Sequence, residues 1–396
     1  MQSTARWLAG GSRGRAIRLI PRREPTGDVL LSYITRPFVA SGRVEADAHT
    51  NVWECRQIAQ TFLDFGYAVD VIDWNNLRFR PARPYRFLVD IGASLERLAP
   101  MVGPDCTKIL HATGKHWLFQ NRAEYERLAA LMARRGVALQ PRRIAPAGSG
   151  VEAADCLTVL GNELTIATLA YSRKPCYRIP LSTTAEFPWD DAKDFAACRR
   201  RFVWFGSSGM VHKGLDLALE AFAATPDLHL TVCGPVDQER DFADFYRREL
   251  YHAPNIRTVG WVDVAGDVFA QIVRSSGAIV YPSCSEGCAG SVVTSLHAGL
   301  VPIISRESGV DVGDFGVILP RSTVADVRAA AIDFSRRPGD ELRRRSRAAW
   351  EYARSYHTRA RFAAEFRAVV EDLLGAKTTR LPAAARLSFS ATDERG

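Results

Sequence analysis

Short apolar runs, each followed by a stretch with helical spacing, recur along almost the whole chain, and this alternation constrains the fold more than any other feature. A first series predicts strands at residues 29–34, 67–73, 86–91, 108–112, 156–160 and 177–181. A second series predicts strands at residues 202–205, 228–233, 256–259, 278–281 and 301–304. Alternating βα units indicate parallel sheets. We therefore predict an α/β chain with two doubly wound, Rossmann-like domains that face each other across a cleft.

The length of 396 residues agrees with two domains, because a domain usually has about 100 to 200 residues. A segment rich in charge and proline, around residues 187–200, separates the two series. The expected divisions are a basic, disordered leader (1–26), an N-terminal domain (27–190), a C-terminal domain that includes the helices after Pro338 (191–375), and a frayed tail (376–396). Within the first domain, Asn121 and Glu124 predict the N-terminal cap of a helix that Gly136 ends.

The formal net charge of +8 is concentrated at the start of the chain, where six arginines precede the first acid, Glu24: Arg6, Arg13, Arg15, Arg18, Arg22 and Arg23. Two interpretations stay open. The segment is a disordered leader or a mis-assigned start, or it is a basic arm that contacts anionic lipid headgroups. It lacks the continuous apolar core of a secretion signal, so we expect no export.

Composition and cysteine spacing favour a soluble chain in a reducing cytoplasm. No stretch is apolar for the ~20 residues that a membrane span requires. The eight cysteines show neither the paired spacings of a zinc site nor the density of a secreted disulfide scaffold. Cys284 and Cys288 are the only close pair, and no histidine lies near them in the sequence. We therefore predict no metal site.

A glycine-rich turn follows the first strand of the second series and opens an amphipathic helix. It runs from Gly206 to Gly214 and contains Ser207, Ser208 and Lys213. Glycines allow close backbone approach, and a helix N-terminus offers free N–H groups and a partial positive charge to a phosphate. Lys213 adds a full charge, although the spacing is not that of a Walker loop. A glycine turn before a helix also occurs in any doubly wound fold, so this motif alone leaves phosphate binding open.

A carboxylate in a turn beyond a buried strand is the second candidate. Glu286 follows the strand at 278–281 and precedes a helix that begins near Gly290. Such a carboxylate can accept hydrogen bonds from sugar hydroxyls, while backbone N–H groups at the helix start hold a diphosphate. The alternative is that Glu286 only caps the turn.

Taken together, these motifs resemble the large retaining GT-B glycosyltransferase family that includes sucrose synthases and bacterial mannosyl and polysaccharide transferases, also called glycosyl transferases group 1. The turn ending in Lys213-Gly214, the strand before Gly260, Ser285-Glu286-Gly287 and the segment 299–302 recur in the family's order and spacing. They cover most of residues 200–320. The N-terminal half resembles the family more loosely, through its strand order and a histidine at a strand end.

The resemblance implies a role for each matching residue. Lys213, beside Gly206 and Ser207, neutralises the donor diphosphate; Glu286 binds the transferred sugar; and the backbone of Gly287, Ala289, Gly290 and Ser291 holds the distal phosphate. The nucleobase of the donor lies near Gly260 and Trp261. His111 contacts the sugar, with His116 as the competing candidate. The loop at 35–50, with His49 and Asn51, carries acceptor contacts, and His116 is expected on the acceptor side as well.

Two departures from the family pattern concern the donor site. The family has an arginine just after the first glycine of the lysine turn, where this chain has Ser207 and Ser208. It also has a second glutamate eight residues after the first, where this chain has Thr294. That glutamate normally holds the ribose hydroxyls, so Thr294 makes a weaker contact or the nucleotide is read elsewhere.

The function that the resemblance implies is transfer of a sugar, as by a hexosyltransferase in cytoplasmic polysaccharide biosynthesis, with retention of configuration. Since no Asp-x-Asp pair ends a strand, we expect no metal and no cofactor besides the nucleotide-sugar co-substrate. The acceptor is a glycan, a lipid-linked glycan or a small molecule; we expect no nucleic-acid partner, and the enzyme can sit peripherally on the inner face of the membrane. Two alternatives remain: a degenerate GT-B protein that binds nucleotide sugars without catalysis, and a nucleotide-sugar epimerase.

Overall fold

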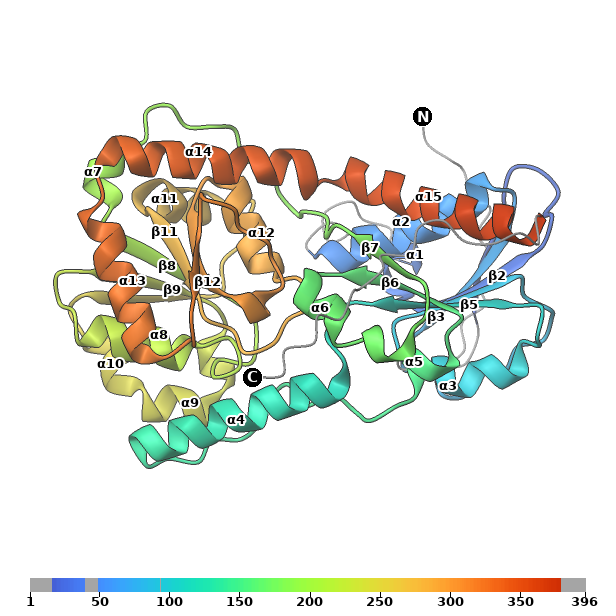
Figure 1. Cartoon of the computed structure of the whole chain (residues 1–396), viewed down its shortest axis with the longest axis horizontal. Helices are drawn as coiled ribbons and strands as arrows, with labels where there is room; N and C mark the ends of the chain where they lie inside the picture. Colours follow the sequence, from blue (N-terminus) through green and yellow to red (C-terminus); the bar gives the residue numbers. More distant parts are fainter. Residues whose placement is uncertain (1–15, 40–48, 93, 379–396) are drawn as a thin grey trace, which may run out of the picture.

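The computed structural model describes residues 16–39, 49–92 and 94–378, and it contains two α/β domains (Figure 1). The N-terminal sheet has the order β1-β3-β2-β4-β5-β6-β7 and the C-terminal sheet the order β10-β9-β8-β11-β12-β13. Every recorded strand pair is parallel except β1 with β3. The prediction of two Rossmann-like domains is therefore confirmed.

The strands of the N-terminal sheet are β1 (Ile17–Leu19), β2 (Asp28–Tyr33), β3 (Ala68–Asp73), β4 (Phe87–Asp90), β5 (Thr107–Ala112), β6 (Cys156–Leu160) and β7 (Cys176–Ile179). Those of the C-terminal sheet are β8 (Arg201–Phe205), β9 (His229–Cys233), β10 (Ile256–Gly260), β11 (Ala278–Tyr281), β12 (Val301–Ser305) and β13 (Val317–Leu319). The apolar runs at 29–34 and 278–281 are buried along almost their whole length, as strands covered by helices on both faces must be. Strands β1 and β13 have three residues each and give no pattern that the sequence analysis detected.

The helices of the N-terminal half are α1 (Arg36–Val39), α2 (Thr50–Asp64), α3 (Leu95–Leu98), α4 (Trp117–Arg135), α5 (Gly150–Ala153) and α6 (Glu163–Ala167). Those that follow are α7 (Phe195–Cys198), α8 (Leu215–Ala223), α9 (Arg240–Phe245), α10 (Arg247–Tyr251), α11 (Asp267–Ser275), α12 (Gly290–His297), α13 (Val324–Arg336), α14 (Gly339–Tyr356) and α15 (Arg359–Thr378). None of the helices within the described ranges is long and apolar enough to cross a bilayer.

The C-terminal sheet reverses its winding between β8 and β11, which are neighbours in the sheet although two strands separate them in the chain. The loops that leave these two strands diverge to opposite faces, so a crevice forms at their carboxyl ends. The lysine turn follows β8 and the glutamate turn follows β11. The topology therefore brings the two predicted motifs to one place.

The expected disordered leader is wrong for residues 17–19, which form β1 against β3. Arg18 donates to Asp28 and Asp70, so its charge is already neutralised within the sheet. Arg22 and Arg23 are exposed. Arg6, Arg13 and Arg15 lie outside the described residues.

Helix α4 belongs to the first half of the chain but extends beneath the C-terminal domain (Figure 1). Near its end, Arg134 binds the buried Asp216 at 2.8 Å and also binds Glu220 of α8. The predicted cap at Asn121 is wrong: the side chain of His116 caps the helix and accepts from the N–H of Leu118. Asn121 instead pairs with the backbone of Ala145, because the helix begins four residues earlier than its polar pattern indicates. Gly136 ends the helix with φ +69°, as predicted.

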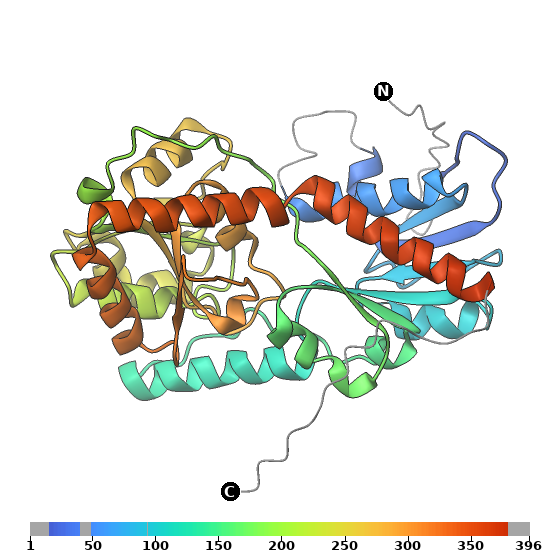
Figure 2. The same ribbon diagram turned by 45° about the horizontal axis from the view of Figure 1, so that its top comes forward.

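The last helix crosses back to the N-terminal domain. Figure 2 shows α14 over the C-terminal sheet and α15 continuing over α2, which α15 contacts together with β7. The expected C-terminal domain therefore ends near residue 357, where the chain passes from one domain to the other. The physical reason is that Phe362 and Phe366 of α15, both fully buried, complete the core of the first sheet.

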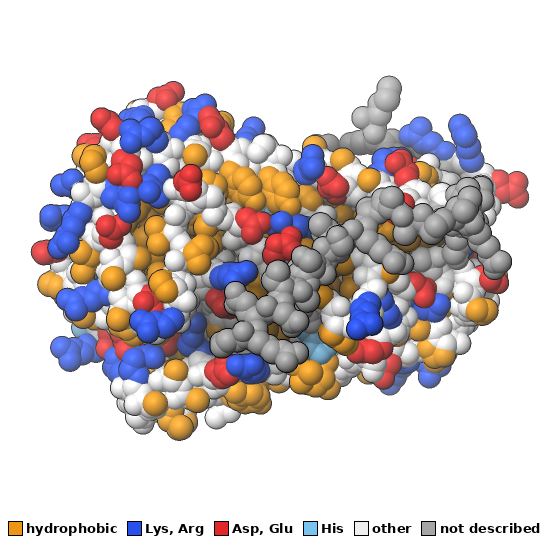
Figure 3. Space-filling view, in the orientation of Figure 1, with side chains coloured by type: hydrophobic (Ala, Val, Ile, Leu, Met, Phe, Trp, Pro, Cys, Tyr) orange, Lys and Arg blue, Asp and Glu red, His pale blue; other side chains and the backbone are white. Residues whose placement is uncertain are grey.

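Charged side chains of both signs are interspersed on the face shown in Figure 3. Lys and Arg side chains of the C-terminal domain alternate there with Asp and Glu side chains. A nucleic-acid surface usually gathers basic residues on one face. The described part of this face does not show that arrangement.

Candidate active site

Lys213 and Glu286 form a buried ion pair at the crevice between β8 and β11. Lys213 Nζ lies 2.5 Å from Glu286 Oε1 and 3.1 Å from the hydroxyl of Tyr281. The same glutamate oxygen accepts from Tyr281 at 3.0 Å. The side chains are 5% and 13% exposed, so both charges are compensated inside the protein rather than by water.

Backbone geometry explains why glycines flank the lysine. Gly209 and Gly214 have φ values of +93° and +73°, in the left-handed region that favours glycine. A Cβ on Gly214 would also lie 2.4 Å from the carbonyl oxygen of Pro282 in the glutamate turn. Glycine at 214 thus allows the two turns to touch. Gly206 is similarly confined, since a Cβ would lie 2.8 Å from the Trp204 ring.

The charges around Glu286 keep it ionised. Burial alone would raise the pKa of its carboxyl, but Lys213, His212 and Arg143 outweigh this effect and lower the pKa to about 2. The buried carboxylate can therefore accept hydrogen bonds from sugar hydroxyls at any physiological pH.

Arg143 is a functional candidate that the sequence analysis missed. It comes from the segment between α4 and α5, and its side-chain carbons pack on Gly209, where a Cβ would lie 2.7 Å from Arg143 Cγ. Its Nε is buried without a partner, and its guanidinium has no recorded hydrogen bond or ion pair to the described residues. An arginine side chain with unused donors thus faces the place where the expected arginine of the lysine turn is missing. The exposed Ser207 and Ser208 do not supply that charge, and no local pattern distinguishes Arg143 from its neighbours.

Glu124 of α4 holds this arrangement together. Its carboxylate accepts from the backbone N–H groups of Arg142 and Arg143 and from the Nδ1 of His212. His212 Nε2 faces the carbonyl oxygen of Ser285. Both ring nitrogens therefore face acceptors. Burial lowers the pKa of His212, but hydrogen bonds to Cys284 and Glu124 outweigh it and raise the pKa to about 9.

The fold gives Cys284 a histidine neighbour that the sequence analysis did not foresee. Sγ lies 3.5 Å from His212 Nδ1, and with Glu124 the three side chains present ligand atoms within 4.8 Å of one another. Because His212 is held as an imidazolium, its ion pair with Glu124 balances the charges of this three-residue cluster without a metal cation. The prediction of no metal site stays a prediction.

Free backbone N–H groups occur at one of the two predicted phosphate sites. In the lysine turn, Gly209 and Met210 donate to the carboxylate of Glu239, so a protein anion already occupies that position. In the glutamate turn, the N–H of Ala289 donates to Ser308, which corrects its assignment as a phosphate donor. The N–H groups of Gly290 and Ser291 begin α12, and neither donates to a backbone carbonyl in the part of the chain that the structure describes.

Gly287 lies at the contact between the domains. A Cβ there would be 2.2 Å from the carbonyl oxygen of Thr113, and its own carbonyl accepts from Thr165 at 2.9 Å. Lys115 Nζ donates to the carbonyls of Glu286 and Glu307. The loop after β5 thus lies directly against the glutamate turn, and Lys115 is a second residue that sequence reasoning missed.

His111 does not reach this site, so its assignment as the sugar-contacting histidine is wrong. It is fully buried on β5, with Nδ1 2.8 Å from the hydroxyl of Thr158. Its ring packs against Phe362 and Phe366 of α15. Burial lowers its pKa to about 4. The β-strand period places its side chain under α15 instead of at the strand end.

His49, at the start of α2, is a second histidine that the charge of Lys213 influences. It caps α2, where its Nδ1 accepts from the N–H of Asn51. Desolvation lowers the pKa of His49, the hydrogen bond to Asn51 opposes this, and the charge of Lys213 adds to the lowering. Most of the loop at 35–50 lies outside the described residues.

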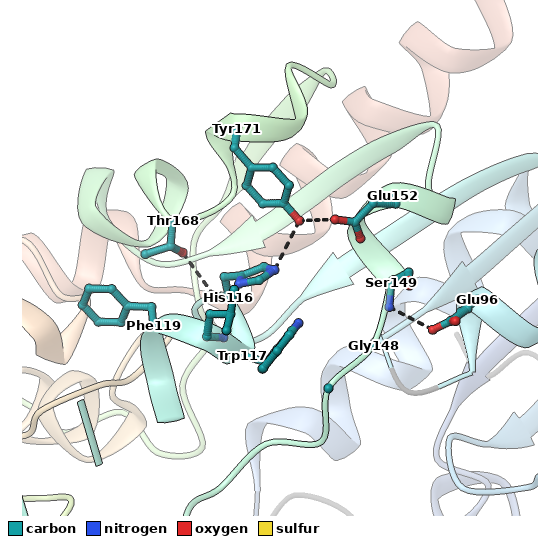
Figure 4. Close-up of a pocket in the computed structure, with 11 residues that line it drawn as sticks. Glu96, His116, Trp117, Phe119, Gly148, Ser149, Glu152, Thr168 and Tyr171 are labelled. Atoms are coloured by element: carbon teal, nitrogen blue, oxygen red, sulfur yellow. Dashed lines mark hydrogen bonds between the residues drawn. The ribbon is translucent and has the colours of Figure 1, made fainter. Parts of the chain in front are cut away.

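The remaining predicted donor residues have different surroundings. Gly260 ends the edge strand β10 with φ +84°, and the indole of Trp261 is 72% exposed. Thr294 is buried on α12. The expected contacts of Gly260 and Trp261 with the nucleobase, and of Thr294 with the ribose, stay predictions. His116 lines a separate pocket in the N-terminal domain (Figure 4).

Comparisons with known proteins bear on this site directly. A family model described as Glycosyl transferases group 1 matches residues 199–336, which contain Lys213 and Glu286. Glycogen synthase 2 of Bradyrhizobium diazoefficiens is 33% identical over 112 residues, which make up 26% of this chain and 22% of that protein. The similarity thus covers less than two thirds of that relative.

Solved structures agree with the fold. Sucrose-phosphate synthase from Thermosynechococcus elongatus aligns over 89% of this chain and 100% of its own, with a TM-score of 0.61 and 16% identity. HepE from Anabaena, in complex with UDP and glucose, aligns over 88% and 100%, with a TM-score of 0.54 and 10% identity. The chain has the GT-B fold, and residues 199–336 of its C-terminal domain match the family model of glycosyl transferases group 1.

Proposed function

We propose that the chain transfers a sugar from a nucleotide-sugar donor to a glycan acceptor. One observation carries the proposal: around the ionised Glu286, the crevice gathers Lys213, the guanidinium of Arg143 and the N–H groups at the start of α12, and within the described ranges neither the guanidinium nor these N–H groups have a recorded partner. Cleavage of the donor requires positive groups that stabilise the departing diphosphate, beside a carboxylate that binds the hydroxyls of the sugar.

The roles of the residues follow from their partners. Glu286 accepts hydrogen bonds from the transferred sugar, and Lys213 lies between that carboxylate and the diphosphate. Arg143 supplies the charge that Ser207 and Ser208 lack. Gly290 and Ser291 donate to the distal phosphate. As the bond from the anomeric carbon to the phosphate oxygen breaks, these groups stabilise the leaving nucleoside diphosphate.

We propose that the reaction retains the anomeric configuration and proceeds without a metal ion. The acceptor hydroxyl attacks from the face that the diphosphate leaves, and a leaving phosphate oxygen takes the hydroxyl proton. The product is a glycoside plus a nucleoside diphosphate. Charge stabilisation comes from Lys213, Arg143 and α12, so the step itself requires no divalent cation or cofactor.

The donor and the cellular setting complete the proposal. HepE, solved with UDP and glucose, makes UDP-hexoses the first donors to test. We propose a cytoplasmic role in polysaccharide biosynthesis. The exposed Arg22 and Arg23 are compatible with a peripheral contact to anionic lipids.

The experiment is a panel of UDP-, GDP- and ADP-sugars incubated with oligosaccharide acceptors, with released nucleoside diphosphate and new glycosides both measured. Glu286→Gln serves as the matched inactive variant, because it keeps size and removes charge. Glycoside formation by the wild type alone supports the proposal, and NMR of the anomeric proton tests retention. Interconversion of donors would indicate an epimerase, and saturable binding without turnover would indicate a degenerate protein; either result overturns it.

A further inference from the structure

A second pocket lies in the N-terminal domain, with a volume of about 750 Å³. Among its lining residues are Glu96, His116, Trp117, Ser149, Glu152 and Tyr171. Figure 4 shows these side chains converging from α3, the start of α4, the segment before α5, α5 itself and the 3-10 turn at 170–172 that follows α6. The volume falls in the range of ordinary ligand sites, which is about 300 to 1,000 Å³.

A chain of hydrogen bonds fixes the polar wall of this pocket. The Nδ1 of His116 accepts from the N–H of Leu118 at 3.3 Å, so the ring proton is on Nε2. Nε2 lies 3.2 Å from the hydroxyl of Tyr171, which donates to Glu152 at 2.5 Å (Figure 4). The wall therefore contains a neutral imidazole, a phenol and a carboxylate in fixed positions. Burial lowers the pKa of His116, and the bond from Tyr171 lowers the pKa of Glu152, which agrees with this assignment.

Aromatic and apolar surfaces complete the pocket. Trp117 lies beside the His116 ring, with centroids 5.6 Å apart, and no hydrogen bond of its indole N–H to the described residues is recorded. Tyr171 is 54% exposed and Leu118 57% exposed. Phe119 also lines the pocket. Exposed aromatic faces beside hydrogen-bonding groups suit a ligand with one apolar face and many hydroxyls.

The charges on the wall have one sign. Glu96 accepts from the N–H of Ser149 at 2.9 Å, which leaves its second oxygen without a recorded partner among the described residues. Glu152 is the other charged residue, and no lysine or arginine is among the described residues that line the pocket. Like charges repel, so a carboxylate or phosphate on the ligand is disfavoured.

The pocket adjoins the proposed donor site through one short loop. Lys115 reaches the carbonyls of Glu286 and Glu307, while His116 and Trp117, the next two residues, line the pocket. Lys115 Nζ also lies 5.8 Å from the centre of the Phe119 ring, another lining residue. A ligand held in the pocket therefore lies against the loop whose preceding residue, Lys115, contacts the turn that carries Glu286.

We infer that this pocket binds an uncharged sugar unit of the acceptor, with Trp117 against the sugar face and Glu152 and Glu96 accepting its hydroxyl hydrogens. This inference rests on the proposed function. It adds that the acceptor presents a neutral sugar here and that uronic or phosphorylated sugars bind poorly.

The test measures binding and turnover separately. Saturation-transfer NMR with neutral gluco-oligosaccharides, with glucuronate-containing ones and with glucosamine measures binding without chemistry. Trp117→Ala should weaken binding of the neutral sugars about tenfold and raise their KM similarly, while KM for the nucleotide sugar stays unchanged. Tyr125→Ala is the matched control, because this tyrosine lies on the same helix and is 56% exposed, yet does not line the pocket.

Two further variants keep the test decisive. Trp117→Phe preserves an aromatic face and should retain most of the binding, which separates lost stacking from lost folding. Glu152→Gln should admit glucuronate-containing sugars that the wild type rejects. The inference is overturned if the wild type prefers glucuronate-containing sugars or glucosamine to neutral sugars. It is also overturned if Trp117→Ala binds neutral sugars as well as the wild type does. If no nucleotide sugar is consumed, the proposed function fails, and the NMR measurements still decide what the pocket binds.

Discussion

The buried pair of Lys213 and Glu286 should be energetically coupled, and this coupling can be measured. Replacing Lys213 by methionine keeps the side-chain length but removes the charge, so the buried Glu286 carboxylate loses its ion-pair partner and keeps the hydroxyl of Tyr281 and the nearby charges of His212 and Arg143. Replacing Glu286 by glutamine leaves a buried ammonium whose remaining neutral partner is Tyr281. Each single change leaves one buried charge without its ion-pair partner, whereas the double change removes both charges.

The structure sets the size of the effect. Lowering the pKa of Glu286 from its ordinary value of 4.5 to about 2 corresponds to about 3 kcal/mol of stability. The side chains are 5% and 13% exposed, and breaking a buried pair of this kind typically costs about 3 to 5 kcal/mol. We expect each single variant to lose about 3 kcal/mol and the double variant to lose clearly less than the sum.

The sign of the pH dependence is fixed by the direction of the shift. A carboxyl whose pKa is lower in the folded state stabilises the fold above its unfolded pKa and loses that contribution as pH falls toward the folded value. The advantage of the wild type over Glu286→Gln should therefore be full above pH 4.5 and should vanish as pH approaches 2.

Urea unfolding of the four proteins at pH 7, followed by circular dichroism, measures the coupling, and repeating the wild type and Glu286→Gln at low pH measures its titration. Additive losses from the two single changes, or a wild-type advantage that is equal at pH 7 and pH 3, would refute the buried ion pair. Calorimetric titration with UDP tests the binding role of each residue. Lys213→Met should weaken binding of the diphosphate, while Glu286→Gln should not.

Four further predictions concern the donor site and the core. Arg143→Ala should weaken binding of UDP about tenfold but not binding of uridine, while Arg142→Ala, which removes a surface ion pair with Asp241, should not; equal effects on UDP and uridine would contradict the diphosphate role. Turnover should survive excess EDTA, and loss of activity with rescue by magnesium would contradict the metal-independent course. Thr294→Glu should tighten nucleotide binding if this position faces the ribose; lower stability without tighter binding in calorimetry would show that the pocket is built around threonine. Since burial lowers the pKa of His111 to about 4, the contribution of His111 to stability should fall by about 2 kcal/mol between pH 6.5 and pH 5, so the stability difference between the wild type and His111→Asn should change by that amount while kcat at neutral pH stays unchanged.

Local patterns were sufficient for the two-domain α/β fold. The strands at 156–160 and 278–281 have the predicted bounds, because buried parallel strands are continuous apolar runs that any window along the chain reveals. The lysine and glutamate turns were placed for a similar reason: a glycine turn after a strand has a local signature, and the topology of a doubly wound sheet brings such turns together.

Contacts between distant segments were not predictable in this way. The strand containing His111 was identified, but α15, about 250 residues later, decides that its side chain is buried under Phe362 and Phe366. Arg143 gives no local signal; it reaches the lysine turn because Glu124 of α4 holds its backbone and because Gly209 leaves room for its carbons.

The sequence by itself thus determined the order of elements, the sheet class and the two turns that carry Lys213 and Glu286. The tertiary structure decided which charges meet there, which histidine is buried, and where the aromatic pocket beside α4 lies. The reason is physical: periodicity and turn chemistry act over a few residues, whereas burial and charge pairing depend on segments that only folding brings into contact.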